Sequence, residues 1–327
     1  MRAQDVLVVG GSGFVGRHLV SALAARGARV TVPTRRRERA RALLTLPTVD
    51  VVQADIGQPG VLERLAAGRD AVVNLAGVLH SRRGRADERG PNGYGPDFAR
   101  VHVELAQAVV NACHAAGVKR LLHMSALGAD PQAPSEYLRS KGIGERAALA
   151  AEDIAVTVFQ PSVIFGPEDS FLNLFALLAR FVPVLAVPSP QAQFQPVYVR
   201  DVAEAFVAAL DDRETHGQRY CLCGPRRYAL RELVQAVCAM TGRRRLVLGL
   251  GPRLSSLQAR VLELSPVKLL TRDNLRSMRV DNVASGVPLP FGLTPHALEA
   301  MAPFYLAAAA ARQHYYAYRE HKHHKAG

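Results

Sequence analysis

The chain has 327 residues, of which 49% are hydrophobic, and this suffices for a large buried core with a smaller appended region. Four cysteines are too few for a disulfide framework, which excludes the small secreted class and favours a reducing compartment. The formal net charge of +13 suits a phosphorylated cofactor, a polyanion or an anionic membrane face. Because the arginines are dispersed and no nucleic-acid-binding motif is visible, no specific nucleic acid partner is expected.

Strand-like runs alternate with amphipathic helical runs in the first half of the chain. Strands are expected over residues 6–9, 29–32, 49–53, 71–75 and 118–124, and helices over residues 14–26 and 100–116. The strands are rich in Val and Leu without polar alternation, as expected where helices cover both faces of a parallel sheet. The first strand starts at Val6 and leaves no room for a targeting segment, so a cytoplasmic protein is expected.

A helix over residues 135–151 and a strand over 154–160 complete this regular part, and the pattern becomes less regular after Pro161. Further helices are expected over residues 201–210 and 230–240 and from about residue 302, with a strand over 219–222. The predicted fold is therefore α/β: a Rossmann-type doubly wound parallel sheet (residues 1–165) and a smaller C-terminal substrate-side region (residues 166–327).

Three segments leave two readings each. The apolar stretch 171–187 includes Arg180 and Pro183 and is expected to be a buried or surface-docked helix, not a membrane span. The glycine-rich segment 81–98 is either a lid over the cofactor crevice or a plain surface loop. The basic, aromatic segment 315–325 is either a solvated tail or a face for anionic lipid.

A glycine-rich turn lies between the first strand and the first helix. It contains Gly10, Gly13 and Gly16 in GxxGxxG spacing. Glycine permits the tight turn and a close approach to a pyrophosphate, and the helix N-terminus supplies free N–H groups. The turn predicts a dinucleotide site that also includes the intervening residues Ser12, Phe14 and Val15.

The second strand ends in arginines where an NAD site usually offers Asp or Glu. The chain reads Pro-Thr-Arg-Arg-Arg at residues 33–37, with no carboxylate to repel a phosphate. Arg35 and Arg36, with Ser12, can hold a 2′-phosphate through charge-assisted hydrogen bonds. NADP(H) is therefore favoured over NAD(H), and the alternative is that these arginines only cap and solvate the next helix.

Three residues predict acid–base chemistry. Ser125 follows an apolar run that should end at the carboxyl edge of a central strand, and Tyr137 and Lys141 share one helix face at i and i+4. A nearby ammonium favours phenolate, so Lys141 is expected to lower the pKa of Tyr137. Tyr137 would exchange a proton with a substrate oxygen that Ser125 positions, while Lys141 also holds the cofactor ribose.

Together these motifs resemble the extended or atypical short-chain dehydrogenases/reductases of the NAD-dependent epimerase/dehydratase type. The match runs to about residue 170 and includes Asp-Ile after the third strand, Asn-Leu-Ala-Gly after the fourth and Pro-Ser-Val-Ile-Phe-Gly after the sixth. The resemblance implies an adenine contact from Asp55. It also implies cofactor contacts from Ile56, Asn74, Ala76, Gly77, Tyr137, Lys141, Pro161, Ser162 and Val163.

Within this group, the stretches HMSALGAD, YLRSKGIGE and TRDNLRSM most resemble relatives of the NADPH-binding accessory subunit of respiratory complex I. This resemblance implies tight NADPH binding. It also implies peripheral contact with a membrane or membrane complex at the inner face. Because that subunit is considered structural, the resemblance argues against turnover, although this sequence keeps the tyrosine and lysine. One position departs from the extended pattern, because His102 stands where an asparagine is typical of the preceding helix, and the usual proton relay is therefore not carried over.

The sequence leaves three functions open. The first is an NADP(H)-dependent oxidoreductase acting on a hydroxyl or carbonyl of an apolar small molecule, quinone-like or lipid-like. The second is a non-catalytic nucleotide-binding factor for assembly or stability of a respiratory membrane complex. The third is a nucleotide-sugar epimerase or dehydratase, which would need convergent basic side chains in the second region. No cluster has catalytic-metal spacing, so no metal is expected.

Overall fold

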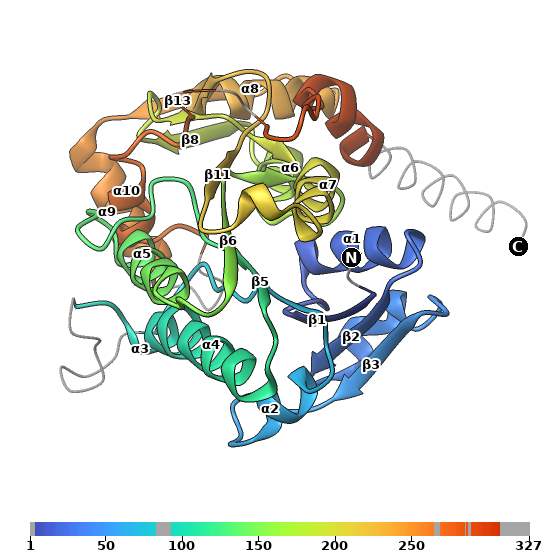
Figure 1. Cartoon of the computed structure of the whole chain (residues 1–327). Coiled ribbons are helices and arrows are strands. Elements are labelled where there is room, and N and C mark those ends of the chain that lie inside the picture. The colour runs from blue at the N-terminus through green and yellow to red at the C-terminus, as the bar shows by residue number, and fades with distance from the viewer. Residues whose placement is uncertain (1–3, 83–92, 265–268, 285, 287–288, 308–327) are drawn as a thin grey trace, which may run out of the picture.

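The computed structural model describes residues 4–82, 93–264, 269–284, 286 and 289–307. Its centre is a sheet of seven parallel strands in the order β11-β6-β5-β4-β1-β2-β3 (Figure 1). The strands are β1 (Asp5–Val9), β2 (Arg29–Thr34), β3 (Val49–Gln53), β4 (Ala71–Asn74), β5 (Arg120–Met124), β6 (Ala155–Pro161) and β11 (Arg219–Leu222). The predicted Rossmann-type sheet is confirmed, and its strand order reverses between β1 and β4, where doubly wound sheets open a crevice.

Helices cover both faces of this sheet, which explains the unbroken apolar strands. One face packs against α1 (Phe14–Ala25) and α7 (Val199–Leu210). The other packs against α2 (Val61–Ala66), α4 (Leu105–Ala116) and α5 (Glu136–Leu149). Side chains of β1 alternate between the two layers, with Val6 and Val8 in one and Leu7 and Val9 in the other.

The helix expected over residues 100–116 is interrupted at its start. After the short α3 (Pro96–Phe98), the chain forms a wide π-helical turn, η3 (Ala99–Glu104), and only then continues as α4. Gly144 of α5 packs directly on this turn, because a Cβ there would overlap the carbonyl oxygen of His102. Segment 81–98, weighed as a lid, lies largely outside the described residues.

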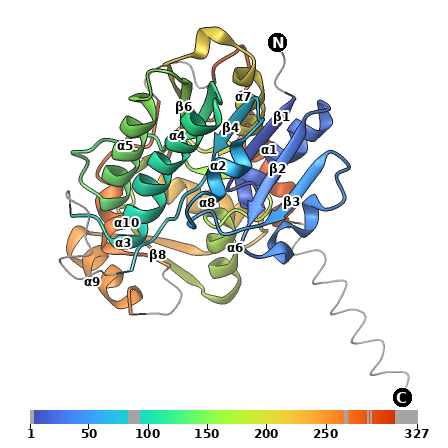
Figure 2. The same ribbon diagram turned by 60° about the horizontal axis from the view of Figure 1, so that its bottom comes forward.

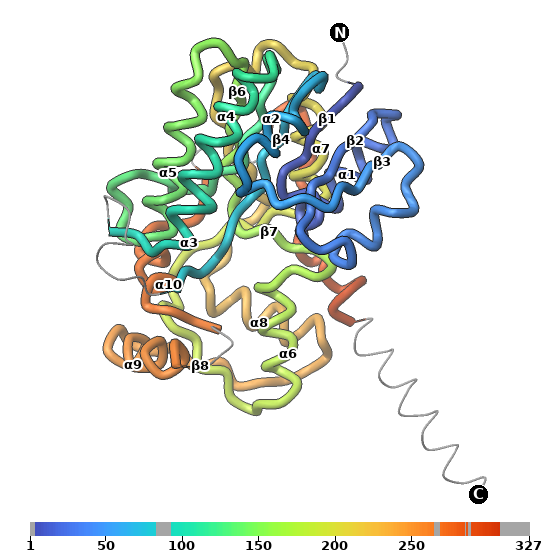
Figure 3. The backbone as a smooth tube through the Cα atoms, turned by 90° about the horizontal axis from the view of Figure 1, so that it is seen from below, coloured from blue at the N-terminus to red at the C-terminus, as the bar shows by residue number. Residues whose placement is uncertain are grey.

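The smaller region contains α6 (Leu172–Phe181), β8 (Val184–Pro188), α8 (Leu230–Met240), β13 (Leu246–Leu250), α9 (Pro252–Leu262) and α10 (Arg272–Ser277). Strands β8 and β13 pair in parallel. The single helix expected over residues 171–187 is wrong: α6 ends at Phe181 and a strand follows. Pro183 stops the helix, since proline lacks the N–H that the next turn needs. Figures 2 and 3 show α6, β8 and α9 together at one end of the molecule.

The chain passes between the two regions more than once. Short strand pairs join β7 (Ile164–Phe165) to β10 (Val197–Tyr198), and β9 (Gln193–Phe194) to β12 (Tyr228–Ala229). Two 3-10 turns, η1 (Arg37–Leu43) and η4 (Arg213–Thr215), follow β2 and α7. A final helix is described over residues 298–307, slightly earlier than expected, and segment 315–325 lies outside the described residues. In the described part of the chain, no helix combines the length and hydropathy needed to cross a bilayer.

Candidate active site

One cleft of about 2020 Å³ opens at the carboxyl ends of the central strands. Every residue proposed from the sequence for cofactor or catalysis lines it, with the exception of Asn74. These are Gly10, Ser12, Gly13, Phe14, Val15, Gly16, Arg35, Arg36, Asp55, Ile56, Ala76, Gly77, Ser125, Tyr137, Lys141, Pro161, Ser162 and Val163.

The glycine turn after β1 has the shape that a pyrophosphate requires. Gly10 adopts φ +82°, and a Cβ there would lie 3.1 Å from the backbone nitrogen of Ala76. At Gly16 a Cβ would overlap the carbonyl oxygen of Gly10, so only glycine lets α1 pack this close to the turn. Helix α1 begins at Phe14 and has no side-chain cap, so its first N–H groups face the cleft.

Three exposed arginines form the rim of the cleft beyond β2. Arg35 and Arg36 line it as predicted, and Arg39 of η1 joins them. Thr34 holds this turn, because its hydroxyl donates to the carbonyl of Arg36 at 3.0 Å. Arg39 was missed from the sequence because it reaches the cleft only through the 3-10 turn. Guanidinium groups suit a phosphate here.

Asp55 and Asn74 shape the cleft by local hydrogen bonds. The Asp55 carboxylate accepts from the N–H of Gly57 at 3.1 Å and lies exposed after β3. Asn74 is buried, and its side chain accepts from the N–H of Ala76 at 3.1 Å while its amide approaches the Nδ1 of His123. Asn74 therefore supports the strand end from behind the cleft wall.

Ser125 is a buried polar group that points into the cleft without a protein partner. Its side chain is only 3% exposed, and its Oγ has no hydrogen-bond partner among the described residues. The backbone N–H of Ser125 donates to the carbonyl of Phe159 at 2.7 Å. This hydrogen bond fixes the backbone at the end of β5. A buried hydroxyl costs free energy unless it is paired, so this position fits a ligand oxygen.

Tyr137 and Lys141 lie on the cleft face of α5, but the expected lowering of the Tyr137 pKa is wrong. Burial raises the pKa of Tyr137 to about 12. Burial also lowers the pKa of Lys141 to about 8, against the opposite effect of the Glu145 carboxylate. The Lys141 ammonium donates to the carbonyl of Met124 at 3.0 Å. Loss of water disfavours the charged phenolate, and the phenol stays protonated at neutral pH.

His102 links the π-helical turn to α5, the helix that carries Tyr137 and Lys141. Its Nε2 accepts from the N–H of Val78 at 3.0 Å, so the ring proton must lie on Nδ1. That Nδ1 contacts the hydroxyl of Ser140 at 2.8 Å, and Ser140 donates to the carbonyl of Tyr137. Burial lowers the pKa of His102 to about 2, and the charge of Lys141 adds to the effect. His102 is therefore a neutral hydrogen-bond bridge at the position of the usual asparagine.

Two polar residues from the smaller region hold backbone N–H groups of segments that line the site, and sequence reasoning missed both. The carboxylate of Asp273 accepts from the N–H groups of Glu136 and Tyr137, at 2.7 and 3.0 Å, and so caps α5 together with Ser135. The side-chain oxygen of Asn282 accepts from the N–H of Val163 at 3.0 Å. Asp273 lies in the TRDNLRSM stretch, which was the available signal.

The far half of the cleft is apolar. Among the described residues from 170 onward, no charged side chain lines it; the lining comes from α6, β8, α9 and α10 and includes Phe171, Phe175, Leu178, Leu185, Leu262, Leu270 and Met278. Its polar members are neutral amides and hydroxyls, such as Gln258 and Asn274. This half suits a hydrocarbon and lacks the cations that a diphosphate would need.

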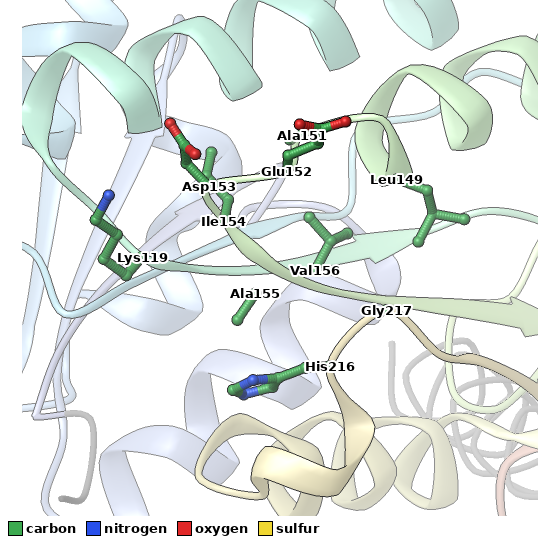
Figure 4. Close-up of a pocket in the computed structure, with 10 residues that line it drawn as sticks. All are labelled: Lys119, Leu149, Ala151, Glu152, Asp153, Ile154, Ala155, Val156, His216 and Gly217. Atoms are coloured by element: carbon green, nitrogen blue, oxygen red, sulfur yellow. The ribbon is translucent and has the colours of Figure 1, made fainter.

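A second hollow, of about 510 Å³, lies at the opposite edge of the sheet, where β5 and β6 begin (Figure 4). Figure 4 shows Glu152 and Asp153 on one side of β6 and His216 on the other, so these groups do not converge. No described residues group into a metal-binding cluster. Of these two hollows, the large cleft is the one that brings Ser125, Tyr137 and Lys141 together.

Comparisons with known proteins agree with this geometry. Residues 6–223 match the family model "NAD dependent epimerase/dehydratase family". The chain is 34% identical to the mitochondrial NADH dehydrogenase (ubiquinone) 1 alpha subcomplex subunit 9 of Mus musculus, over 84% of this chain and 72% of that protein. It is 37% identical to the ceramide reductase of Caulobacter vibrioides, over 62% of this chain and 60% of that protein. The solved structure of MoeE5 with UDP-glucose and NAD shares the fold, with TM-score 0.63 and 22% identity over 77% of this chain and 86% of that one.

Proposed function

Because this chain belongs to the NAD-dependent epimerase/dehydratase family, we propose that it is an NADP(H)-dependent reductase acting on the carbonyl of an apolar, lipid-like substrate. The observation that carries the proposal is the composition of the cleft. Ser125, Tyr137 and Lys141 lie between a glycine turn suited to a dinucleotide and a half-cleft without charged side chains.

The three side chains divide the work of a carbonyl reduction. Ser125 directs its unpartnered Oγ at the substrate oxygen. Tyr137, protonated at neutral pH, gives its proton to that oxygen as the carbonyl becomes an alcohol. The Lys141 ammonium stabilises the phenolate that remains until solvent returns the proton. A bound reduced nicotinamide supplies the hydride to the carbonyl carbon.

The preference for NADP(H) rests on the arginine rim. Arg35, Arg36 and Arg39 gather where the adenosine end of a dinucleotide would lie. A 2′-phosphate would be held by charge-assisted hydrogen bonds, whereas the hydroxyl of NAD would leave these cations unused. NAD(H) is then the weaker ligand of the same site.

The substrate class follows from the far half of the cleft. A sugar nucleotide would place two phosphates there, but the described lining from residue 170 onward offers them no cation, and this argues against the epimerase alternative. The relative from Caulobacter vibrioides is named a ceramide reductase, which supports a carbonyl or hydroxyl on a long-chain lipid as the reacting group. A quinone with an apolar tail belongs to the same chemical class.

A second candidate function is a nucleotide-binding role without turnover, in association with a respiratory membrane complex. The 34% identity with a mitochondrial subunit of NADH dehydrogenase favours it. The same cleft would then hold NADPH as a structural ligand. In that case Ser125, Tyr137 and Lys141 would not be needed for function in the cell. Their substitution therefore distinguishes the two candidate functions.

Tyr137→Phe tests the proposal directly. Removing one hydroxyl keeps the ring and its contacts with Phe98 and His102. We expect kcat for NADPH oxidation with long-chain ketones or quinones to fall roughly 100-fold or more, with NADPH affinity unchanged. Absence of turnover by the wild type with every carbonyl offered, together with full complementation of a deletion strain by Tyr137→Phe, would instead favour the structural role.

A further inference from the structure

Large apolar side chains are exposed mainly at one end of the molecule. Of twelve exposed large hydrophobic residues in the described part of the chain, nine belong to α6, β8, β13 and the α9 segment. We call these nine the apolar face: Leu177, Phe181, Val184, Leu246, Leu248, Leu254, Leu257, Val261 and Leu264. Contiguous exposed apolar patches of this kind mark interaction surfaces.

The elements that carry the apolar face are packed together. Val184 of β8 pairs with Leu246 of β13, and two residues on, Ala186 pairs with Leu248, so the exposed side chains share one face of this small sheet. Helix α9 is fixed to β8 by Gln258, whose amide donates to the carbonyl of Ala186 at 3.0 Å. The side chain of Arg245 donates to the carbonyl of Ala179 and ties β13 to α6. Figure 1 shows β13 beside β8, and Figures 2 and 3 show β8 between α6 and α9.

Helix α9 presents an exposed apolar stripe to solvent. Leu254, Leu257, Val261 and Leu264 follow one another at spacings of three, four and three residues, which places them on one side of a helix. Each is more than half exposed, and Leu264 reaches 84%. Arg253 and Arg260, both exposed, lie along one flank of this stripe. An amphipathic helix with arginines beside exposed leucines is typical of a membrane interface.

The charge on the elements of the apolar face is mostly basic, and the exception, Glu263 between Val261 and Leu264, is paired with Arg272 at 3.0 Å. Segments 171–190 and 240–262 contain no Asp, Glu, Lys or His, but they contain Arg180, Arg243, Arg244, Arg245, Arg253 and Arg260. The Arg180 guanidinium lies 5.2 Å from the ring centroid of Phe181. No described carboxylate forms a salt bridge with these six arginines. A surface of exposed leucines among arginines complements an anionic bilayer.

We propose that the apolar face docks on the surface of an anionic lipid bilayer and that the cleft receives its substrate there. Leu177 and Val184 belong to both the apolar face and the cleft lining, so the apolar half of the cleft opens at this face. A lipid-like substrate would then pass from the bilayer to Tyr137 without crossing water. The entry route rests on the proposed function, whereas the docking itself is measured without substrate, so the two can fail separately.

Vesicle flotation of the purified full-length protein tests the docking. We expect it to float with vesicles of phosphatidylglycerol and phosphatidylcholine in equal parts and much less with phosphatidylcholine alone. Raising the salt from about 0.1 M to about 1 M should weaken the binding, because the screening length falls from roughly 10 Å to roughly 3 Å. Absence of flotation with the anionic vesicles at low salt would overturn the proposal.

A paired variant tests the face itself. Leu254→Asp with Leu257→Asp should lower the vesicle partition coefficient about tenfold or more, since both leucines lose apolar contact and gain a repelled charge. The matched control is Phe304→Asp, which is 77% exposed outside the apolar face and should float like the wild type. Unchanged NADPH affinity shows that each variant is folded.

Two other results would overturn the proposal. Equal flotation of the paired variant and the wild type would show that another surface binds lipid. A wild-type dimer in sedimentation that becomes a monomer in the paired variant would show that a second copy of the chain covers the apolar face.

Discussion

The two halves of the cleft are built from different kinds of sequence. The cofactor half consists of short segments at strand ends, with the glycine turn after β1, the arginines after β2 and Ser125 after β5. The substrate half is assembled from two stretches that are far apart in the chain, α6 with β8 and α9 with α10, and these elements contribute no charged lining residue among those described. The polar and charged lining residues therefore lie mainly in the cofactor half, and the lining of the substrate half is mainly apolar.

This division means that the halves should respond differently to substitution. Changes in the cofactor half should alter nucleotide affinity and pH dependence. Changes in the substrate half should alter lipid recognition and leave the nucleotide in place. Asp273 and Asn282 are the exceptions, because they come from the substrate side and hold backbone N–H groups of the cofactor side.

The largest difference between the halves should appear on removal of the arginine rim. Arg35→Ala with Arg36→Ala deletes two cations that would meet the 2′-phosphate, and hydrogen bonds to charged groups contribute about 1.5–3 kcal/mol each. Both side chains are exposed, so solvent screens them and their loss should cost less than the full sum of two such bonds. We expect the NADPH dissociation constant to rise roughly tenfold to 100-fold, with that of NADH nearly unchanged, as measured by calorimetric titration.

Arg37→Ala is the matched control for the rim. Arg37 is exposed in the same arginine run, yet it does not line the cleft, so its removal should leave both affinities as they are. An equal loss of NADPH affinity in Arg37→Ala would point to general surface charge, and the rim would not be a specific phosphate site.

A smaller effect, on acid stability, should also belong to the cofactor half. Burial lowers the pKa of His102 to about 2 and of His123 to about 3, whereas both would titrate near 6.5 in the unfolded chain. Below pH 6.5 the His102 and His123 rings become protonated in the unfolded chain but stay neutral in the folded protein. The free energy of unfolding therefore falls with decreasing pH, by about 1.4 kcal/mol per pH unit for each histidine, until the folded pKa is reached.

Urea unfolding at about pH 7 and about pH 5 checks this sign. His102→Asn should lose less stability between the two pH values than the wild type does. Asparagine does not titrate, so unfolding of the variant takes up one proton fewer. His114→Asn, at an exposed position of α4, should behave like the wild type. If His102→Asn keeps the full pH dependence, the acid sensitivity has another source.

The sequence was informative wherever a contact lies within a few residues of a strand end. The glycine turn, Arg35, Ser125 and the Tyr137–Lys141 pair were predicted to line a site, and they line one cleft. The sequence did not reveal the contacts of Asp273 or Asn282, because their partners lie more than a hundred residues away; for Asp273 the TRDNLRSM stretch was a signal, but it named no partner. Pro183 was visible, but the strand after it depends on pairing with β13.

The direction of the Tyr137 pKa failed for a related reason. Helical spacing correctly placed Lys141 beside Tyr137, and an ammonium in water would favour the phenolate. Spacing cannot show how deeply the pair is buried. Burial acts on both groups and dominates, so the expected lowering became a rise to about 12.

Asp273 offers a way to test whether the halves are coupled. It stands at the start of α10, itself capped by Thr271, and the side chain of Arg276 on that helix lies near Glu136 of α5, at 3.6 Å. Its carboxylate occupies the N-terminus of α5, where a negative charge is favourable and the first N–H groups lack partners in the helix. The substrate-side region thus fixes the end of the helix that carries Tyr137.

Asp273→Asn should therefore have the smallest effect on stability and activity. Its effect should nevertheless appear in both halves, because Asp273 belongs to the substrate side and holds the helix that carries Tyr137. Loss of the charge and of one good acceptor should lower the free energy of unfolding by about 1 kcal/mol, as for other N-cap changes, and kcat a few-fold through a less fixed Tyr137. NADPH affinity should stay the same. Asp281→Asn, at an exposed position of the same region, is the control for loss of a carboxylate. Unchanged kcat and stability in Asp273→Asn would mean that the catalytic helix is positioned by the cofactor half alone, with His102 and Ser140 as its remaining support.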